Sequence, residues 1–284
     1  MSLILDHVSQ IYNADTEMAV KALDDINLTI KSGEFIGLIG HTGSGKSTLV
    51  QHLNGLISPT SGTVFFEGKD ISEKGYNRKE LRKHVGLVFQ YPEHQLFETD
   101  VFADVCFGPK NMGLSKSETE YAAFEALRKV DFPTDLYYSS VFDLSGGQKR
   151  RAAIAGVLAM KPDYLILDEP TAGLDPSGKK EILDMVSELH SQSGITIILV
   201  SHCMEDVAEY VERVIVMDHG RVAFDDTPRE VFSRVNELTS MGLDIPEPSK
   251  IVRKLHENGL DIDVTALTVS EAAESIYKAV KSKR

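Results

Sequence analysis

Short apolar segments with strand character alternate with segments of helical periodicity over the first 225 residues of this chain. Strand patterns occupy residues 3–8, 26–30, 35–39, 63–66, 85–89, 164–169 and 195–200, and helical patterns occupy residues 48–55, 79–83, 149–160 and a segment after residue 176. The last helix has a buried stripe formed by Ile182, Leu183, Met185, Val186 and Leu189. Alternation of this kind predicts an α/β fold with parallel strands.

Residues 91–143 interrupt the alternation, because strand patterns vanish there. Ser115 and Glu118 form a capping box, which predicts the start of a helix. Apolar side chains at helical spacing follow it, namely Tyr121, Phe124, Leu127 and Val130. Together with the helix at residues 149–160, this region predicts a mostly helical subdomain, about residues 91–160, inserted into the sheet domain.

A hairpin closes the main domain near residue 225, with strands at 214–217 and 221–224 joined by Asp218-His219-Gly220. Residues 226–284 form a separate tail with a short helix at 249–258 and a final helix that Thr268 and Glu271 cap. This tail is too small for a convincing core of its own. We therefore expect it to pack on residues 1–225 or to pair with a neighbouring subunit.

One glycine-rich loop stands between the strand at 35–39 and the helix at 48–55 and matches the pattern G-x-x-x-x-G-K-[ST]. Its glycines let backbone N–H groups turn toward an anion, and the helix dipole favours the same anion. Lys46 then reaches the β- and γ-phosphates of a nucleotide, and the Ser47 hydroxyl ligates Mg²⁺. The predicted nucleotide-binding residues are Gly40, His41, Thr42, Gly43, Ser44, Gly45, Lys46, Ser47 and Thr48.

Polar residues that follow two other predicted strands add chemistry to this loop. Asp168 and Glu169 end a buried strand, and alternation along the strand aims their carboxylates differently. Asp168 can hold the hydration shell of Mg²⁺, whereas Glu169 can act as general base for the attacking water. Gln90 ends another strand, where it either reaches the metal or the attacking water or is an ordinary surface residue.

Three further features each admit a structural and a functional interpretation. Tyr12 is either a half-exposed strand tyrosine or a platform for the adenine ring. Ser145, which opens the helix of residues 149–160, is either a plain N-cap or part of a second anion-binding helix end. His202 follows the strand at 195–200, which we expect beside the Asp168–Glu169 strand, and this placement favours a γ-phosphate contact over a purely structural role.

Charge and cysteine content narrow the classes of partner. The net charge of −13 argues against nucleic acid or an anionic lipid surface as the main partner, because phosphate backbones attract clustered cations. Cys106 and Cys203 have no metal-ligand spacing, so a reducing cytosol is expected. We expect no secretory signal peptide, and the longest apolar stretch, residues 195–200, is too short to span a bilayer.

In order and spacing these motifs resemble the ATP-binding-cassette (ABC) ATPases over about residues 3–225. The resemblance implies a P-loop core with a mixed sheet, an N-terminal antiparallel β subdomain and a small C-terminal α extension. It makes Tyr12 the adenine-stacking aromatic, Gln90 a link to a transmembrane partner and a metal contact, and His202 the switch residue. Ser145 and Gly147 would bind the γ-phosphate in the opposite subunit, and Asp175 would cross the subunit interface. Two ATP molecules and Mg²⁺ would thus lie between two ATPase subunits.

A finer resemblance connects residues 89–97, 107–111 and 153–160 to the ATPases of energy-coupling factor (ECF) transporters, which import vitamins and some transition-metal ions. Gly156 stands where many ABC ATPases have Arg, and the Tyr-Pro-Glu-His run of residues 91–94 is most similar to the second of two paralogous ATPases. The resemblance implies a second ATPase subunit, identical or paralogous. It also implies a transmembrane coupling subunit held through residues 91–111, a substrate-binding membrane subunit contacted indirectly, and a peripheral position on the cytoplasmic face of the membrane.

Three alternatives remain at this stage. One is the ATPase of another importer, for cobalt or nickel alone or for an unrelated substrate. Another is an ABC ATPase that acts on nucleic acid or chromosomes, but residues 91–143 leave no room for a long coiled coil, and the chain carries one cassette. The third is a module that sequesters ATP without turnover, against which the presence of Glu169 and His202 argues.

Overall fold

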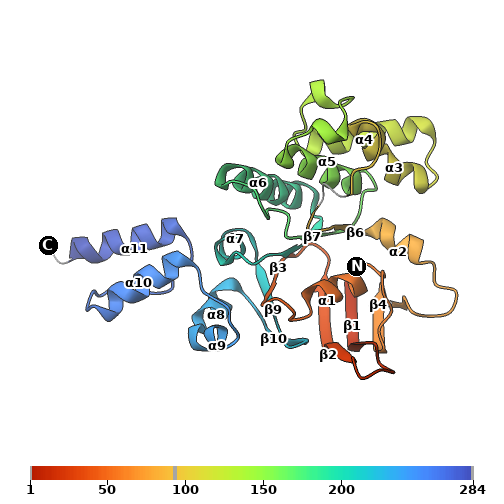
Figure 1. The fold of residues 1–284 in the computed structure, drawn as a ribbon. Coiled ribbons are helices and arrows are strands. Elements are labelled where there is room, and N and C mark those ends of the chain that lie inside the picture. Colours follow the sequence, from red (N-terminus) through yellow and green to blue (C-terminus); the bar gives the residue numbers. More distant parts are fainter. Residues whose placement is uncertain (1, 92–94, 283–284) are drawn as a thin grey trace.

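The computed structural model describes residues 2–91 and 95–282 and contains two β-sheets (Figure 1). The strands of the larger, six-stranded sheet are β3 (Phe35–Gly40), β6 (Val85–Val88), β7 (Tyr164–Asp168), β8 (Thr196–Val200), β9 (Arg213–Asp218) and β10 (Arg221–Asp226). Their spatial order is β10-β9-β3-β8-β7-β6, and all neighbours pair in parallel except the antiparallel hairpin β9–β10. The predicted mixed α/β sheet is therefore confirmed, as is the position of β8 beside β7.

The second sheet is four-stranded and antiparallel, in the order β2-β1-β4-β5. Its strands are β1 (Ser2–Tyr12), β2 (Val20–Lys31), β4 (Ser61–Phe66) and β5 (Lys69–Asp70). This sheet confirms the predicted N-terminal antiparallel β subdomain. Helix α1 (Lys46–Leu53) lies between the two sheets in sequence and buries Leu49, Val50 and Leu53 in the same apolar cluster as the inner face of β1 and β2.

Both faces of the six-stranded sheet are covered, which explains why its central strands are apolar throughout. In β3, Phe35 and Ile39 belong to one buried cluster, whereas Ile36 and Leu38 belong to another, because successive side chains point to opposite faces. The first cluster is completed by α6 (Pro176–Ser193), whose buried residues are the five that the helical pattern predicts. Gly194 ends α6 with φ +66°, as a left-handed C-cap.

The inserted region is helical, with α3 (Val101–Asn111), α4 (Lys116–Lys129) and α5 (Gly146–Leu158), and it occupies the top of Figure 1. Ser115 and Glu118 form the predicted capping box at the start of α4. Helix α5 begins three residues before the predicted start at 149, because the Ser145 hydroxyl accepts a hydrogen bond from the Gln148 N–H and caps the helix there. Residues 92–94, which belong to the Tyr-Pro-Glu-His run of the finer resemblance, lie outside the described residues.

Further helices connect these parts and form the C-terminal region. They are α2 (Arg78–His84), α7 (Met204–Tyr210), α8 (Pro228–Ser233), α9 (Val235–Ser240), α10 (Glu247–Glu257) and α11 (Val269–Ser282). Val231, Phe232 and Leu238 of α8 and α9 join the main core, whereas α10 and α11 have a small apolar cluster of their own around Val252 and Ala272. Figure 1 shows α10 and α11 side by side, projecting away from both sheets.

None of the helices within residues 2–91 and 95–282 has both the length and the apolar character that crossing a bilayer requires.

Candidate functional site

The phosphate loop runs from the end of β3 to the first turn of α1, as its pattern predicts, and its shape requires glycine at two positions. At Gly40 an added Cβ would lie 2.4 Å from the Met217 carbonyl oxygen and 2.5 Å from the Ser44 hydroxyl. Gly45 has φ +105°, and a Cβ there would lie 2.6 Å from the Ala22 carbonyl oxygen. Only residues without a side chain allow the loop to lie this close to its neighbours.

The Lys46 side chain folds back onto the main chain of this loop. Its Nζ donates to the carbonyl oxygens of Gly40, at 2.6 Å, and of His41, at 3.0 Å. Burial lowers the pKa of Lys46, and the carboxylates of Glu169 and Asp168 oppose that shift. The ammonium is therefore a buried donor whose present partners belong to the loop itself, so phosphate oxygens can replace them without loss of hydrogen bonding.

The donors around the loop fit a nucleotide phosphate with Mg²⁺. The Ser44 hydroxyl is buried and has no hydrogen-bond partner within the described part of the chain, so a ligand oxygen would satisfy it. The Ser47 hydroxyl is exposed in the first turn of α1, where an ion can reach it. Hydroxyl and carboxylate oxygens are the ligand types that Mg²⁺ prefers, and the carboxylate of Asp168 supplies the second type next to Lys46.

Glu169 lies at the centre of the catalytic candidates. Its Oε1 pairs with Nε2 of His202 at 2.8 Å, and its Oε2 accepts a hydrogen bond from Nε2 of Gln90 at 2.7 Å. The three residues follow the carboxyl ends of β7, β8 and β6, which are neighbours in the sheet. Glu169 has φ +48°, and its N–H donates to the Val200 carbonyl oxygen, so the main chain also holds it in place. The structure thus brings together all three predicted catalytic residues.

Asp168 is the last residue of β7, directly before Glu169. Burial raises the pKa of its carboxyl group, and the neighbouring Glu169 carboxylate raises it further, against the opposing effect of Lys46. Two carboxylates and one ammonium therefore share a poorly hydrated space. A divalent cation in this space would stabilise the ionised form of Asp168.

Tyr12 stands at the edge of the loop. Its ring is 37% exposed, and its hydroxyl lies 3.3 Å from the Thr48 hydroxyl in α1. The tyrosine is thus a half-exposed strand residue that also lies next to the nucleotide-binding residues. Its role as a stacking platform remains a prediction.

Within residues 2–91 and 95–282, no hydrogen bond joins Ser145, Gly147 or Asp175 to the phosphate loop, and the side-chain bonds of Ser145 and Asp175 are local. Ser145 caps α5, and a Cβ at Gly147 would meet nothing within 4 Å, so this helix end is open. Asp175 caps α6 by accepting a hydrogen bond from the Gly178 N–H at 2.7 Å. Helix capping explains the positions of the Ser145 and Asp175 side chains. The contacts of Ser145, Gly147 and Asp175 with another subunit remain predictions.

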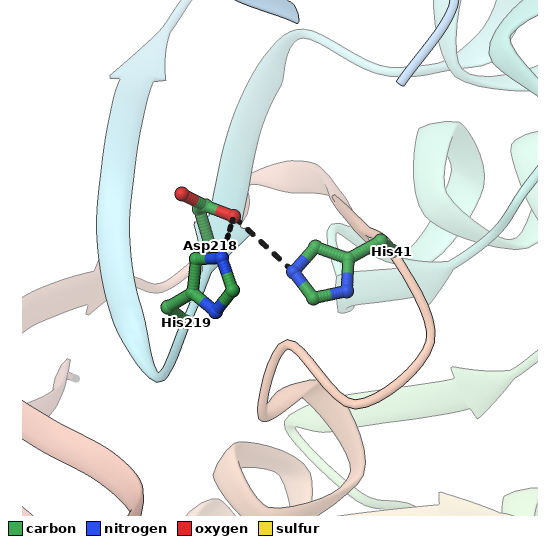
Figure 2. Close-up of side chains that lie close together, drawn as sticks. All are labelled: His41, Asp218 and His219. Atoms are coloured by element: carbon green, nitrogen blue, oxygen red, sulfur yellow. Dashed lines mark hydrogen bonds and ion pairs between the residues drawn. The ribbon is translucent and has the colours of Figure 1, made fainter. Parts of the chain in front are cut away.

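The sequence analysis missed one grouping at the loop. His41 meets the β9–β10 turn, where Nε2 of His41 lies 3.2 Å from Oδ1 of Asp218 and His219 stands beside both (Figure 2). The turn itself was predicted, but no pattern in the sequence links it to a loop that precedes it by 177 positions. Only the pairing of β9 with β3 brings the two together.

Comparison with known proteins agrees with the resemblance to ABC ATPases that the sequence motifs indicate. The family model described as "ABC transporter" matches residues 23–172. The chain is 50% identical to the energy-coupling factor transporter ATP-binding protein EcfA2 of Caldanaerobacter subterraneus, over 99% of this chain and 98% of that protein. It is also 50% identical to the EcfA2 protein of Clostridioides difficile, over 100% of this chain and 99% of that protein.

Two solved structures have the same fold. One is cbiO1 from Clostridium perfringens, part of the ABC transporter complex cbiONQ, with a TM-score of 0.74 and 40% identity over 83% of this chain and 93% of that one. The other is the dimeric ATP-binding cassette MJ0796 in a post-hydrolysis state with ADP and Pi, with a TM-score of 0.71 and 28% identity over 80% and 98%. The chain therefore belongs to the ABC transporter family and, within it, to the ATP-binding proteins of energy-coupling factor transporters.

Proposed function

We propose that this chain binds ATP and hydrolyses it to power an ECF-type importer of vitamins or transition-metal ions. The observation that carries the proposal is the Glu169 carboxylate, held between Gln90 and His202 at the strand ends beside the phosphate loop. A carboxylate oriented by two partners is the arrangement that a general base for water requires. The family relationship agrees with this chemistry.

ATP would bind with its phosphates in the loop of residues 40–47 and its adenine on Tyr12. Lys46 would exchange its bonds to Gly40 and His41 for the β- and γ-phosphates, where its charge stabilises the transferring phosphoryl group. Ser47, Gln90 and Asp168 are the residues that would hold Mg²⁺. When bound, this ion neutralises charge on the β- and γ-phosphate oxygens.

Glu169 would orient the attacking water and take its proton. In the structure, Gln90 and His202 each occupy one carboxylate oxygen of Glu169, so both partners fix the direction of the lone pairs. His202 is 44% exposed at its side chain, which leaves its ring accessible for a γ-phosphate contact. Gln90 would sense the metal and report the state of the site to residues 91–111.

The site is half of a larger one in this proposal. Ser145, Gly147 and Asp175 would complete the ATP site of a second ATPase subunit, and that subunit would supply the same groups here. The open N-terminus of α5 presents first-turn N–H groups and a positive dipole end, which favour a phosphate from another chain. The dimeric form of MJ0796 supports this interpretation.

A groove in the helical region suits the transmembrane partner. It has a volume of about 820 Å³ and lies between α2, α3 and α5. Phe97 and Phe107 stand edge-to-face with ring centroids 4.7 Å apart, and both rings line the groove although they are 56% and 41% exposed. Exposed aromatic pairs of this kind are typical anchors for a partner helix. We infer that a cytoplasmic helix of the membrane subunit binds here, which would make the chain a peripheral protein of the cytoplasmic face.

The C-terminal extension, residues 226–284, is proposed to pair with the second ATPase. Exposed apolar side chains of α10 and α11 support this role, namely Ile251, Val269, Tyr277 and Val280. The substrate-binding membrane subunit would contact the transported substrate, and this chain would associate with that subunit only indirectly, through the coupling subunit. The 40% identity to cbiO1 favours, as a second candidate function, the ATPase of an importer for another substrate.

The requirement for two chains predicts that an isolated monomer turns over slowly. Without the donors of an opposite α5, we expect phosphate release per chain at least about 100-fold slower than in the assembled transporter. The measurement is steady-state phosphate release at several protein concentrations, with the oligomeric state checked by light scattering. Full turnover by a strictly monomeric sample would contradict the composite site.

Glu169→Gln isolates the general base. The amide keeps the size of the side chain but cannot take a proton, so we expect ATP affinity like that of the original chain and hydrolysis at least about 100-fold slower. Nucleotide binding and phosphate release in the assembled transporter measure the two effects. The exposed Glu73→Gln serves as the control, and turnover of Glu169→Gln close to that control would overturn the assignment.

Asp168→Asn tests two separate effects of the Asp168 carboxylate, namely its effect on folding stability and its role as a Mg²⁺ ligand. The pKa of Asp168 is raised from 3.8, so this carboxyl binds its proton more tightly in the folded chain, and its contribution to folding stability falls as the pH rises from 3.8 through the raised pKa. We therefore expect nucleotide-free Asp168→Asn to melt at a higher temperature than the original chain at pH 7, with a difference that shrinks toward pH 3.8.

The same variant should need more Mg²⁺ to bind ATP, because one oxygen ligand is lost. Thermal melting from pH 7 down toward pH 3.8 and a Mg²⁺ titration in the presence of ATP test the two effects. Asp15→Asn, at an exposed position, is the control. Equal melting temperatures of Asp168→Asn and the original chain at pH 7 would contradict the destabilising effect of the buried charge. An unchanged Mg²⁺ requirement would contradict the role of Asp168 as a metal ligand.

Phe107→Ala tests the groove. An aromatic anchor contributes about 2 kcal/mol or more to binding, so we expect affinity for the membrane subunit to fall by roughly 30-fold while ATP binding stays unchanged. Co-purification in detergent and a nucleotide-binding assay give the two readouts. Tyr121→Ala, which removes another exposed aromatic ring of the helical region, is the matched control. Equal recovery of the complex with both variants would rule out this surface.

A further inference from the structure

Three potential metal ligands meet where the phosphate loop touches the β9–β10 hairpin. They are His41 of the loop, Asp218 at the end of β9 and His219 in the turn, and Figure 2 shows both imidazole rings on the same carboxylate oxygen. Within residues 2–91 and 95–282 they form the one group of three His, Cys, Asp or Glu whose ligand atoms could hold an ion, and these atoms all lie within 4.8 Å of one another. The proposed hydrolysis of ATP uses none of the three side chains.

The hydrogen bonds of His41 define the state of its ring. Nδ1 lies 2.8 Å from the Thr42 carbonyl oxygen, and because a carbonyl can only accept, Nδ1 carries the proton. In the neutral ring Nε2 then presents a lone pair, yet it faces Oδ1 of Asp218 at 3.2 Å, which is another acceptor. Two acceptors at this distance repel unless a positive centre lies between them. Either a second proton or a bound cation supplies that centre.

The arrangement fits a metal ion well. The carbonyl bond at Nδ1 fixes the tautomer and aims Nε2, which is how histidine ligands are oriented in metalloproteins. Ligands of a tetrahedral zinc ion lie about 3.3 Å apart, since each bond is near 2 Å. His41 and Asp218 already have this separation, and Nε2 of His219 lies 3.9 Å from Oδ1 of Asp218. The side chain of His219 is 85% exposed, so it can close the remaining gap.

We propose that His41, Asp218 and His219 bind one divalent transition-metal ion of the zinc class, with water as the remaining ligand. Two imidazoles and one carboxylate favour such ions over Mg²⁺ and Ca²⁺, which prefer oxygen ligands. The main chain supports the site on both sides, because the Gly220 N–H donates to the Ser44 carbonyl oxygen at 3.0 Å. The ion would join the phosphate loop to the hairpin and thereby restrain His41, whose carbonyl oxygen also accepts a hydrogen bond from Lys46.

His219→Asn provides a clean test. His219 and Gly220 have φ values of +44° and +77°, and Asn-Gly is the preferred pair for such a two-residue turn, so the variant keeps the hairpin but removes the imidazole. His7→Asn is the matched control, because His7 also has a positive φ, of +50°, and pairs with Asp25, but lacks a second histidine. Both variants are made in the full-length chain, stripped of metal and kept free of nucleotide.

Titration with Co²⁺ followed by visible absorption, and competition with Zn²⁺, measure binding directly. We expect one ion per chain in the original protein and in His7→Asn, and an affinity at least about 10-fold weaker in His219→Asn. Zn²⁺ should also raise the melting temperature of the first two proteins more than that of His219→Asn. Glu169→Gln should bind the ion like the original chain, which separates this site from the proposed hydrolysis.

Three outcomes would overturn the proposal. They are the absence of bound Co²⁺ in the original chain, equal affinity in His219→Asn, and a thiolate charge-transfer band, which would place the ion at a cysteine instead.

Discussion

Parallel pairing of β6, β7, β8 and β3 is the constraint on which the rest of the site depends. It places the carboxyl ends of strands from distant parts of the chain at one edge of the sheet. Gln90, Glu169 and His202 leave that edge from three neighbouring strands, and the phosphate loop leaves it from a fourth. Both faces of the sheet are buried in apolar clusters, so the segments that carry these polar groups start from a packed core.

Burial of charge at this edge has a cost that the ligands of the site can offset. Lys46, Asp168 and Glu169 share a poorly hydrated space, and desolvation disfavours the charged forms of Lys46 and Asp168. In the nucleotide-free chain, Lys46 satisfies its donors with carbonyl oxygens of its own loop. Phosphate oxygens and a divalent ion would complement the same groups more completely. The site thus suits an anionic phosphate and a divalent cation together.

The β9–β10 hairpin supports the phosphate loop from the side opposite the catalytic residues. Gly220 donates to the main chain of Ser44, and Met217 lies against Gly40 so closely that no side chain fits between them. The Asp218–His41 contact adds a side-chain link to this main-chain support. Residues far apart in the sequence therefore fix the conformation of the loop that contacts the nucleotide, and any group bound at the hairpin acts on it directly.

Local patterns in the sequence were sufficient for much of this protein. Loop motif, helix caps and apolar runs each depend on neighbouring residues, which is why the position of the phosphate loop between β3 and α1, the Ser115–Glu118 capping box and the apolar stripe of α6 were predicted correctly. The start of α5 was predicted three residues too late, because the first turn after Ser145 has no apolar side chain from which helical periodicity could be read.

Tertiary structure alone decided the rest. The contacts of Glu169 with Gln90 and His202, and the grouping of His41 with Asp218 and His219, join positions separated by 33 to 178 residues. Strand order and register across the whole sheet set these distances, and of the strand order the sequence predicted only the β9–β10 hairpin and the position of β8 beside β7. The sequence thus determined which chemical groups are present and the local elements that carry them, whereas the packing of the sheet decided which groups meet.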